Sequence, residues 1–270
     1  SRLYKSGDGG YAWLELSAHV GGGVPWTNLA VSPDDATIIA VVTDGGTNVW
    51  ASLDGGNNFF NTNVLALGAA ETITCIAISP CYGGLSGAAR DIAIGTADAL
   101  AGSGTGRVFI MALGSFPLAW TDVSTGAAGW IKPLIAAVDV FAVAYPAGYG
   151  ADKVMLAIVA DVAAGSGDTY LYAGQRDATG VVTWNIWVDY PVEITKSGED
   201  SPPSPLTYAS LALPSDYFGG DAATRRVYAS WSDGVGGNAN DDVYRLDDTT
   251  VVRLDAGSGI EFVCSTLAYW

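Results

Sequence analysis

Two short stretches of the chain share one pattern: Ser6-Gly7-Asp8-Gly9-Gly10-Tyr11-Ala12-Trp13 and Ser52-Leu53-Asp54-Gly55-Gly56-Asn57-Asn58-Phe59. Both fit Ser-x-Asp-x-Gly-x-x-Trp/Phe. The aspartate can accept hydrogen bonds from backbone N–H groups of its own turn, the glycine can adopt a positive φ, and the aromatic residue fastens the turn onto the next strand. The pattern therefore predicts two hairpin turns, organised by Ser6, Asp8, Gly10 and Trp13 in the first and by Ser52, Asp54, Gly56 and Phe59 in the second.

A larger unit repeats along the chain. Alternating apolar segments end at a proline four times, about 45 to 70 residues apart, at Pro33, Pro80, Pro146 and Pro214. Because proline cannot donate to a strand ladder, each proline marks the end of a strand. A tyrosine follows three of these prolines closely, at Tyr82, Tyr149 and Tyr217.

Three further strands are expected after each of these segments. The second strands are predicted at 37–43, 91–96, 153–159 and 226–231, and the third at 48–52, 107–113, 169–173 and 242–246. A fourth begins near Phe59, at Trp120, at Trp184 and at 251–254. Four short strands in a repeated order predict the blades of a β-propeller, whereas a β-sandwich would not repeat the proline and aromatic landmarks.

The Ser-x-Asp-x-Gly-x-x-Trp/Phe turn resembles the Asp-box of BNR-like β-propeller families, and the repeated units resemble bacterial S-layer or other cell-surface propeller proteins. The resemblance implies an all-β fold, a propeller of about five or more four-stranded antiparallel blades, and an extracellular or cell-surface location. It includes bacterial sialidases, but the chain lacks their arginine cluster and their Arg-Ile-Pro-like stretch. No sialidase catalytic residue is therefore assigned.

The domain organisation that we expect is a single β-propeller domain over residues 1–270. Its predicted parts are a partial blade at 1–20, blades at about 24–65, 71–125, 138–190 and 206–255, and a partial blade at 259–270. A chain that starts and stops within a blade favours a fragment of a larger propeller. Its unpaired strand edges would be covered by other residues or by a neighbouring molecule.

Composition limits the function further. The net charge is −16, so a nucleic-acid partner is not expected, since phosphate binding needs clustered lysine and arginine. No apolar run reaches the length of a transmembrane helix. One histidine and three cysteines without a C-x-x-C pair argue against a histidine-based triad or a zinc site. An odd number of cysteines leaves at least one outside an intrachain disulfide.

An oxygen-rich, glycine-interrupted loop is the one candidate for a bound ion. Calcium prefers such ligands, although asparagine, aspartate and glycine also simply form turns. The candidate calcium ligands are Asp233, Asn238, Asn240, Asp241 and Asp242. No other cofactor is expected, and no catalytic residue is assigned.

Two functions remain open. The first is a non-enzymatic cell-surface or extracellular structural or interaction module, such as an S-layer component that self-associates or contacts other surface proteins. The alternative is a glycan-binding or glycoside-hydrolase-type propeller. With 28 acidic residues, any pair of carboxylates could be proposed for hydrolysis, so the sequence favours the non-enzymatic function.

Overall fold

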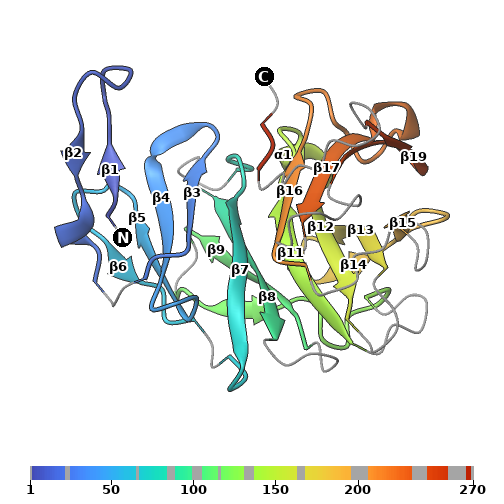
Figure 1. The fold of residues 1–270 in the computed structure, drawn as a ribbon, viewed down its shortest axis with the longest axis horizontal. Coiled ribbons are helices and arrows are strands. Elements are labelled where there is room, and N and C mark those ends of the chain that lie inside the picture. The colour runs from blue at the N-terminus through green and yellow to red at the C-terminus, as the bar shows by residue number, and fades with distance from the viewer. Residues whose placement is uncertain are drawn as a thin grey trace.

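The computed structural model describes residues 2–21, 25–64, 67–83, 89–98, 105–114, 117–130, 137–162, 168–195, 206–232, 242–254 and 266–268. These residues form antiparallel sheets that follow one another in chain order (Figure 1). A two-stranded sheet comes first, made of β1 (Tyr4–Lys5) and β2 (Leu14–Glu15), followed by the short helix η1 (Ser17–His19).

Four larger sheets follow, which we number 1 to 4. Sheet 1 contains β3 (Asn28–Ser32), β4 (Asp35–Thr43), β5 (Asn48–Ser52) and β6 (Phe60–Asn61). Sheet 2 contains β7 (Glu71–Ile78), β8 (Arg90–Asp98), β9 (Val108–Leu113) and β10 (Trp120–Asp122).

Sheet 3 has a divided outer strand. It contains β11 (Val138–Ala144), β12 (Val154–Asp161), β13 (Thr169–Arg176), β14 (Val182–Trp184) and β15 (Val192–Thr195), and both β14 and β15 pair with β13. Sheet 4 contains β16 (Tyr208–Ala212), β17 (Arg226–Ser232), β18 (Asp242–Asp247) and β19 (Thr250–Arg253). The short helices α1 (Tyr149–Asp152) and η2 (Ala222–Thr224) lie in the loops after β11 and β16.

Each sheet pairs its strands in chain order, and the first strands β3, β7, β11 and β16 contact one another from sheet to sheet. These four strands therefore form the inner side of the arrangement. The prediction of an all-β fold built from four-stranded antiparallel units is confirmed.

The central residues of the middle strands β8 and β12 are apolar on both faces because both faces of a sheet are covered. In β8, Ile92 and Ile94 pack with sheet 1, while Ala93 between them packs with sheet 3. In β12, Leu156 packs with sheet 4 and Met155 with sheet 2. Successive side chains of a strand point to opposite faces, so one strand contributes to two interfaces.

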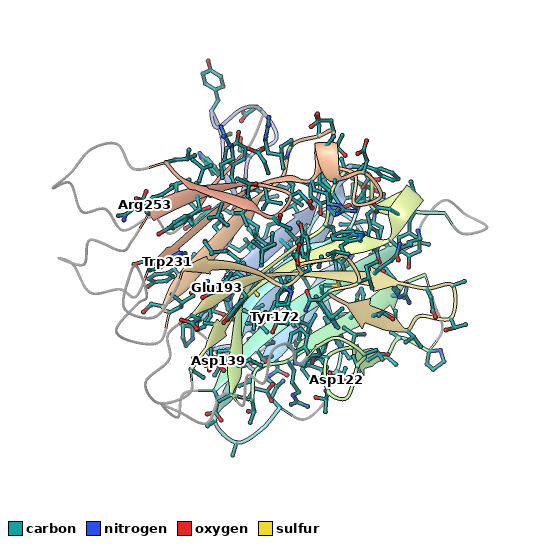
Figure 2. The ribbon with its side chains drawn as sticks, turned by 90° about the vertical axis from the view of Figure 1, so that its right-hand side faces the viewer. Asp122, Asp139, Tyr172, Glu193, Trp231 and Arg253 are labelled. Carbon is teal, nitrogen blue, oxygen red and sulfur yellow. The ribbon has the colours of Figure 1, made fainter. Side chains whose placement is uncertain are left out.

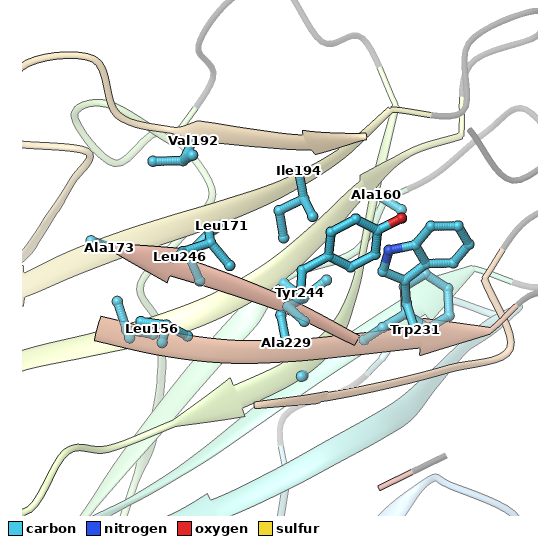
Figure 3. Packing of buried hydrophobic residues seen from close by; sticks show 14 of the residues in the cluster. Leu156, Ala160, Leu171, Ala173, Val192, Ile194, Ala229, Trp231, Tyr244 and Leu246 are labelled. Atoms are coloured by element: carbon cyan, nitrogen blue, oxygen red, sulfur yellow. The ribbon is translucent and has the colours of Figure 1, made fainter. Parts of the chain in front are cut away.

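Three apolar clusters thus fill the three interfaces between neighbouring sheets. Figure 3 shows the cluster between sheets 3 and 4, where Leu171 and Ile194 meet Trp231, Tyr244 and Leu246. The Trp231 and Tyr244 rings stack with their centroids 6.1 Å apart. The sheets are consequently held together by face-to-face burial.

Candidate functional site

A network of hydrogen bonds joins sheets 2 and 3 around Asp91, which is fully buried. The Tyr149 hydroxyl donates to Oδ2 of Asp91, and the Tyr82 hydroxyl donates to Oδ1 at 2.8 Å. Arg176 Nη1 lies 3.2 Å from Oδ2 and so supplies the opposite charge. We call these four residues together with Lys153 the Asp91 joint.

The loops after the inner strands explain why these residues meet. Tyr82 follows β7 of sheet 2, and Tyr149 lies in α1, which follows β11 of sheet 3. In both sheets, the tyrosine in the loop after the first strand reaches Asp91. Lys153 adopts a positive φ of 57° at the C-terminal end of α1, which turns the chain sharply into β12. The local turns therefore bring side chains from two sheets to one carboxylate.

An aspartate also joins neighbouring sheets at the other two interfaces. Asp34 of sheet 1 accepts from the backbone N–H of Cys81 at 2.9 Å and pairs with Arg90 at 3.1 Å. Asp152 of sheet 3 accepts from the backbone N–H of Gly219 at 2.7 Å. A carboxylate that accepts hydrogen bonds from the next sheet is therefore a structural joint, and Asp91 is the most deeply buried of the three aspartates.

Protonation in the Asp91 joint is set by burial. Burial, assisted by the Asp91 charge, raises the pKa of Tyr82 to about 12, and burial raises the pKa of Tyr149 even further. Both phenols consequently stay protonated and act as donors at neutral pH. Burial lowers the pKa of Lys153, whose Nζ lies 3.9 Å from the centre of the Tyr82 ring.

A groove between the outer parts of sheets 2 and 3 opens beside Arg176. It encloses about 470 Å³, a size within the range of small-molecule sites. Its aliphatic wall is formed by Ile110, Ala112, Ala119, Val181 and Val182.

Three threonines, Thr121, Thr125 and Thr179, add hydroxyl groups to the lining of this groove. Asp122 is the one carboxylate among its lining residues, and Figure 2 labels its place on β10. Oδ1 of Asp122 accepts from the Ser124 backbone at 2.9 Å, from the Ser124 hydroxyl at 2.8 Å and from the Thr125 backbone at 2.9 Å. Although burial alone would raise the pKa of Asp122, these hydrogen bonds keep it below the usual value.

A second hollow, of about 280 Å³, lies along the inner strands. Asn28, Thr74, Thr207 and Ser210 give it a polar lining, and the backbone N–H of Leu267 donates to Ser210 Oγ at 3.0 Å.

Another buried carboxylate, that of Asp139 in β11, lies near the C-terminal end of β8. Asp139, which Figure 2 labels, is 3% exposed, and its Oδ1 accepts a hydrogen bond from the backbone N–H of Asp98 at 2.9 Å. Burial raises the pKa of Asp139 to about 6, with the nearby Asp98 and Glu71 charges adding to the effect. Glu71 itself pairs with Arg107.

The first sequence-predicted turn lies at the tip of the β1–β2 hairpin. Ser6 Oγ accepts from the Gly10 backbone at 2.7 Å, and Oδ1 of Asp8 accepts from the Ala12 backbone at 2.9 Å. Gly10 has a φ of 96° and lies beside the Trp13 ring. Trp13 stays 62% exposed, so it rests on its own turn instead of joining the core.

The second predicted turn repeats this geometry between β5 and β6. Ser52 Oγ accepts from the Gly56 backbone at 2.9 Å, and Oδ1 of Asp54 accepts from the Asn58 backbone at 2.9 Å. The Asn58 side chain also donates to Oδ2 of Asp54, and its hydrogen bonds lower the pKa of Asp54 to about 2. Phe59, the aromatic residue of the pattern, is half-buried and directly precedes β6.

The two turns differ in what covers them. Gly56 is buried under Leu16, and its carbonyl oxygen lies 2.8 Å from Nδ1 of His19. The single histidine of the sequence thus serves as a contact between the first hairpin and sheet 1.

The predicted calcium loop lies mostly outside the described residues: Asp233, Asn238, Asn240 and Asp241 belong to the part that is not described. Asp242 is the first residue of β18, is buried and forms an ion pair with Arg253, which Figure 2 labels. In the described part of the chain, no three His, Cys, Asp or Glu residues cluster in a way that could hold a metal ion. Calcium binding stays a prediction.

Neither Cys75 nor Cys81 forms a disulfide, and burial raises the pKa of the Cys75 thiol to about 12. Cys264 lies outside the described residues. Among the described residues, no helix has both the length and the apolar character needed to cross a membrane.

Comparison with solved structures identifies the architecture. A crystal structure of the GH74 enzyme of Niastella koreensis matches 93% of this chain and 34% of its own, with 17% sequence identity and a TM-score of 0.56. The chain has the β-propeller fold. Sheets 1 to 4 are its blades, and the chain spans about a third of the length of the GH74 enzyme.

Two other solved structures are similar over the same share of the chain, at lower scores. A structure of YCF48 bound to D1 peptide has 13% identity, 60% of that chain covered and a TM-score of 0.46. An auxiliary nutrient binding protein from Bacteroides thetaiotaomicron has 13% identity, 53% of that chain covered and a TM-score of 0.45. No protein-family model matches the sequence, and no curated protein matches it either.

Proposed function

We propose that this β-propeller is a non-enzymatic interaction module of an extracellular or cell-surface protein, for example a component of a surface layer. The observation that carries the proposal is the groove between sheets 2 and 3. It is large enough to hold a ligand, but Asp122, the one carboxylate in its lining, already holds three hydrogen bonds from its own turn.

Glycoside hydrolysis usually needs two carboxyl groups about 5 to 9.5 Å apart across the scissile bond. Neither of the two hollows described above has two carboxylates in its lining. The buried Asp91 is equally unsuited, because it is fully covered and bonded to Tyr82, Tyr149 and Arg176. These arrangements favour binding over catalysis.

Self-association is the form of interaction that the surface supports. Leu29 and Val31 on β3 are 52% and 46% exposed, and Tyr208 on β16 is 50% exposed. Leu29 and Tyr208 line the same inner hollow. Exposed apolar side chains that gather around one hollow are typical of a contact surface.

The test combines two measurements on the purified chain. Release of reducing ends from xyloglucan and other β-glucans is followed over many hours, and sedimentation velocity is measured over a range of protein concentrations. We expect no release above a heat-denatured control, and a sedimentation coefficient that rises with concentration. Sustained hydrolysis, or a sedimentation coefficient that does not change with concentration, would contradict the proposal.

A second function, glycan binding, is favoured by the first hairpin. Tyr11 is 94% exposed and Trp13 is 62% exposed at the same turn, which gives two aromatic faces on which a sugar ring could stack. Affinity electrophoresis in polysaccharide gels distinguishes this function. Retardation that Trp13→Ala abolishes, and that the matched exposed variant Tyr208→Ala retains, would support it. Equal mobility with and without polysaccharide would contradict a glycan-binding function.

A further inference from the structure

Asp122 has a carboxylate oxygen to spare beyond its own turn. Its Oδ1 accepts all three hydrogen bonds from Ser124 and Thr125. Its Oδ2 lies 3.7 Å from Nη1 of Arg107, which is too far for a full hydrogen bond, and Arg107 makes its closest contacts with Glu71. An ionised carboxylate has lone pairs for about four hydrogen bonds. Because the Asp122 side chain is 22% exposed and lines the groove, a donor in the groove can use those that remain.

Hydroxyl groups of the groove can accept hydrogen bonds from the same ligand. The Thr179 hydroxyl donates its proton to Oδ1 of Asp177 at 2.7 Å, so its oxygen offers only lone pairs to a molecule in the groove. Thr121 and Thr125 are exposed in the lining, and a hydroxyl can accept as well as donate. The polar groups of the groove therefore suit a ligand that carries several donors.

The charges around the groove are negative in sum. Both arginines beside it, Arg107 and Arg176, already have a buried carboxylate partner of their own. Asp122 and the exposed Asp177 are carboxylates in addition to these, and hydrogen bonds from Thr179 hold the pKa of Asp177 below its usual value. The net charge of −16 adds to the negative potential, so the groove favours a cation.

The wall that a ligand can reach is apolar. Ala112, Pro117, Ala119 and Val181 line the groove, and each of them is exposed or half-buried. A hydrocarbon chain that covers this wall would remove apolar surface from water on both sides. A ligand that combines one ammonium group with a short aliphatic chain would match both parts of the groove.

We propose that the groove between sheets 2 and 3 binds a small aliphatic primary amine in its ammonium form, with the ammonium group on Oδ2 of Asp122 and the hydrocarbon chain against Ala119 and Val181. This inference rests on the proposed binding function of the groove and names the chemistry of its ligand. An ammonium group has three donors and no acceptor, which matches a carboxylate oxygen flanked by hydroxyl groups.

Hexylammonium is a suitable probe, and hexan-1-ol is its neutral counterpart. Binding of each to the intact chain is measured by NMR titration with ¹⁵N-labelled protein at neutral pH, in which the Thr125, Thr179 and Gly180 amides report on the groove. Saturable shifts are expected for hexylammonium. Hexan-1-ol should bind at least about tenfold more weakly, because it lacks the charge that strengthens a hydrogen bond to a carboxylate.

Asp122→Asn removes the charge at nearly constant size and should weaken hexylammonium binding about tenfold or more. Since this change also affects the turn around Ser124, the amide spectrum of the variant is compared with that of the parent to verify its fold. If the variant does not fold, a second variant outside the turn decides the question.

Val181→Lys is this second variant, since Val181 is 59% exposed and lines the groove. The added cation should weaken hexylammonium binding about fivefold or more, while hexan-1-ol stays within about twofold of its affinity for the parent. Val188→Lys is the matched control, because Val188 is 84% exposed, lies outside the groove lining and undergoes the same change of charge. Its affinity for hexylammonium should stay within about twofold of the parent.

The outcomes separate this inference from the proposed function. Equal binding of hexylammonium and hexan-1-ol, or full affinity in a folded Asp122→Asn variant, would overturn the ammonium assignment and leave the groove as a binding site. Equal losses in Val181→Lys and Val188→Lys would overturn it as well, because the cation would then respond only to the net charge. No saturable shift with either probe would also overturn the inference, while the proposed function would still be decided by its own hydrolysis and sedimentation measurements.

Discussion

The Tyr149 hydroxyl donates a hydrogen bond to the fully buried carboxylate of Asp91, so a loop of sheet 3 is fastened to the first residues of the middle strand of sheet 2. Three apolar clusters supply the burial between the sheets, but apolar contacts have little directionality. The aspartates at positions 34, 91 and 152 add directional contacts at one corner of each interface. They therefore fix the position of each sheet relative to the next.

Removing the Tyr149 hydroxyl should destabilise the protein. Tyr149→Phe keeps the ring contacts but leaves Asp91 with one donor fewer in a buried place, at a cost of about 1–3 kcal/mol. Tyr145→Phe is the matched control, since its ring lies 4.6 Å from that of Tyr149 and its buried hydroxyl has no partner. Removal of the Tyr145 hydroxyl should leave the stability unchanged or raise it slightly. Urea denaturation of both variants measures the difference, and equal effects would show that the hydrogen bond to Asp91 contributes nothing.

The two aspartates of the repeated turn, Asp8 and Asp54, should contribute unequally to the thermal stability of the protein. Both accept hydrogen bonds within their turns, but in the turn of Asp54 the buried Gly56 lies under Leu16, and Asp54 also accepts a hydrogen bond from the Asn58 side chain. Asp54→Ala should therefore lower the melting temperature by about 2–4 °C, and Asp8→Ala by less. Thermal denaturation followed by circular dichroism checks this. Unchanged melting with loss of a binding activity would instead assign these aspartates to a site.

Much of the fold could be predicted from the sequence, because the deciding signals are local. The proline-ended segments and the Ser-x-Asp-x-Gly turns depend on backbone chemistry within a few residues. The expected strand at 48–52 coincides with β5, and the one at 37–43 with most of β4. The divided outer strand of sheet 3 was not predicted, because Tyr190-Pro191 interrupts the run between β14 and β15 without any periodic signal.

The candidate site was harder to predict because it depends on contacts between distant residues. Asp91 and Arg176 are 85 positions apart in sequence, and neither lies in a recognisable motif. The tyrosines that follow the prolines were the one available signal, since Tyr82 and Tyr149 both donate to Asp91. The function of those tyrosines became evident only when two sheets were placed side by side.

Calcium should stabilise the protein if the loop around residues 233–242 binds it. The expected result is a higher melting temperature in millimolar calcium than in EDTA, by mass action on the folded state. Asp241→Asn should remove this increment, whereas Asp189→Asn, the same change of charge in the loop between β14 and β15, should retain it. Identical melting curves in calcium and in EDTA would show that no stabilising calcium site exists.

Asp139 should make stability depend on pH in the opposite sense to a paired carboxylate. Its pKa is raised to about 6 by burial, so between about pH 4 and pH 6 the native state holds more protons than the unfolded state. The free energy of unfolding therefore falls as pH rises through this window, and it stays at the lower level above it.

Asparagine at position 139 imitates the protonated carboxyl group and can still accept the hydrogen bond from the Asp98 backbone. Asp139→Asn should stabilise the protein by about 1–2 kcal/mol near neutral pH, with the gain vanishing near pH 4. Asp122→Asn is the control of opposite sign, because the hydrogen bonds to Asp122 hold its pKa below the usual value and favour its charged form. Urea denaturation at several pH values measures both. If Asp139→Asn destabilises the protein at neutral pH, the charged carboxylate at this position must be favoured by its surroundings, and the assignment of burial as the dominant effect on Asp139 would be wrong.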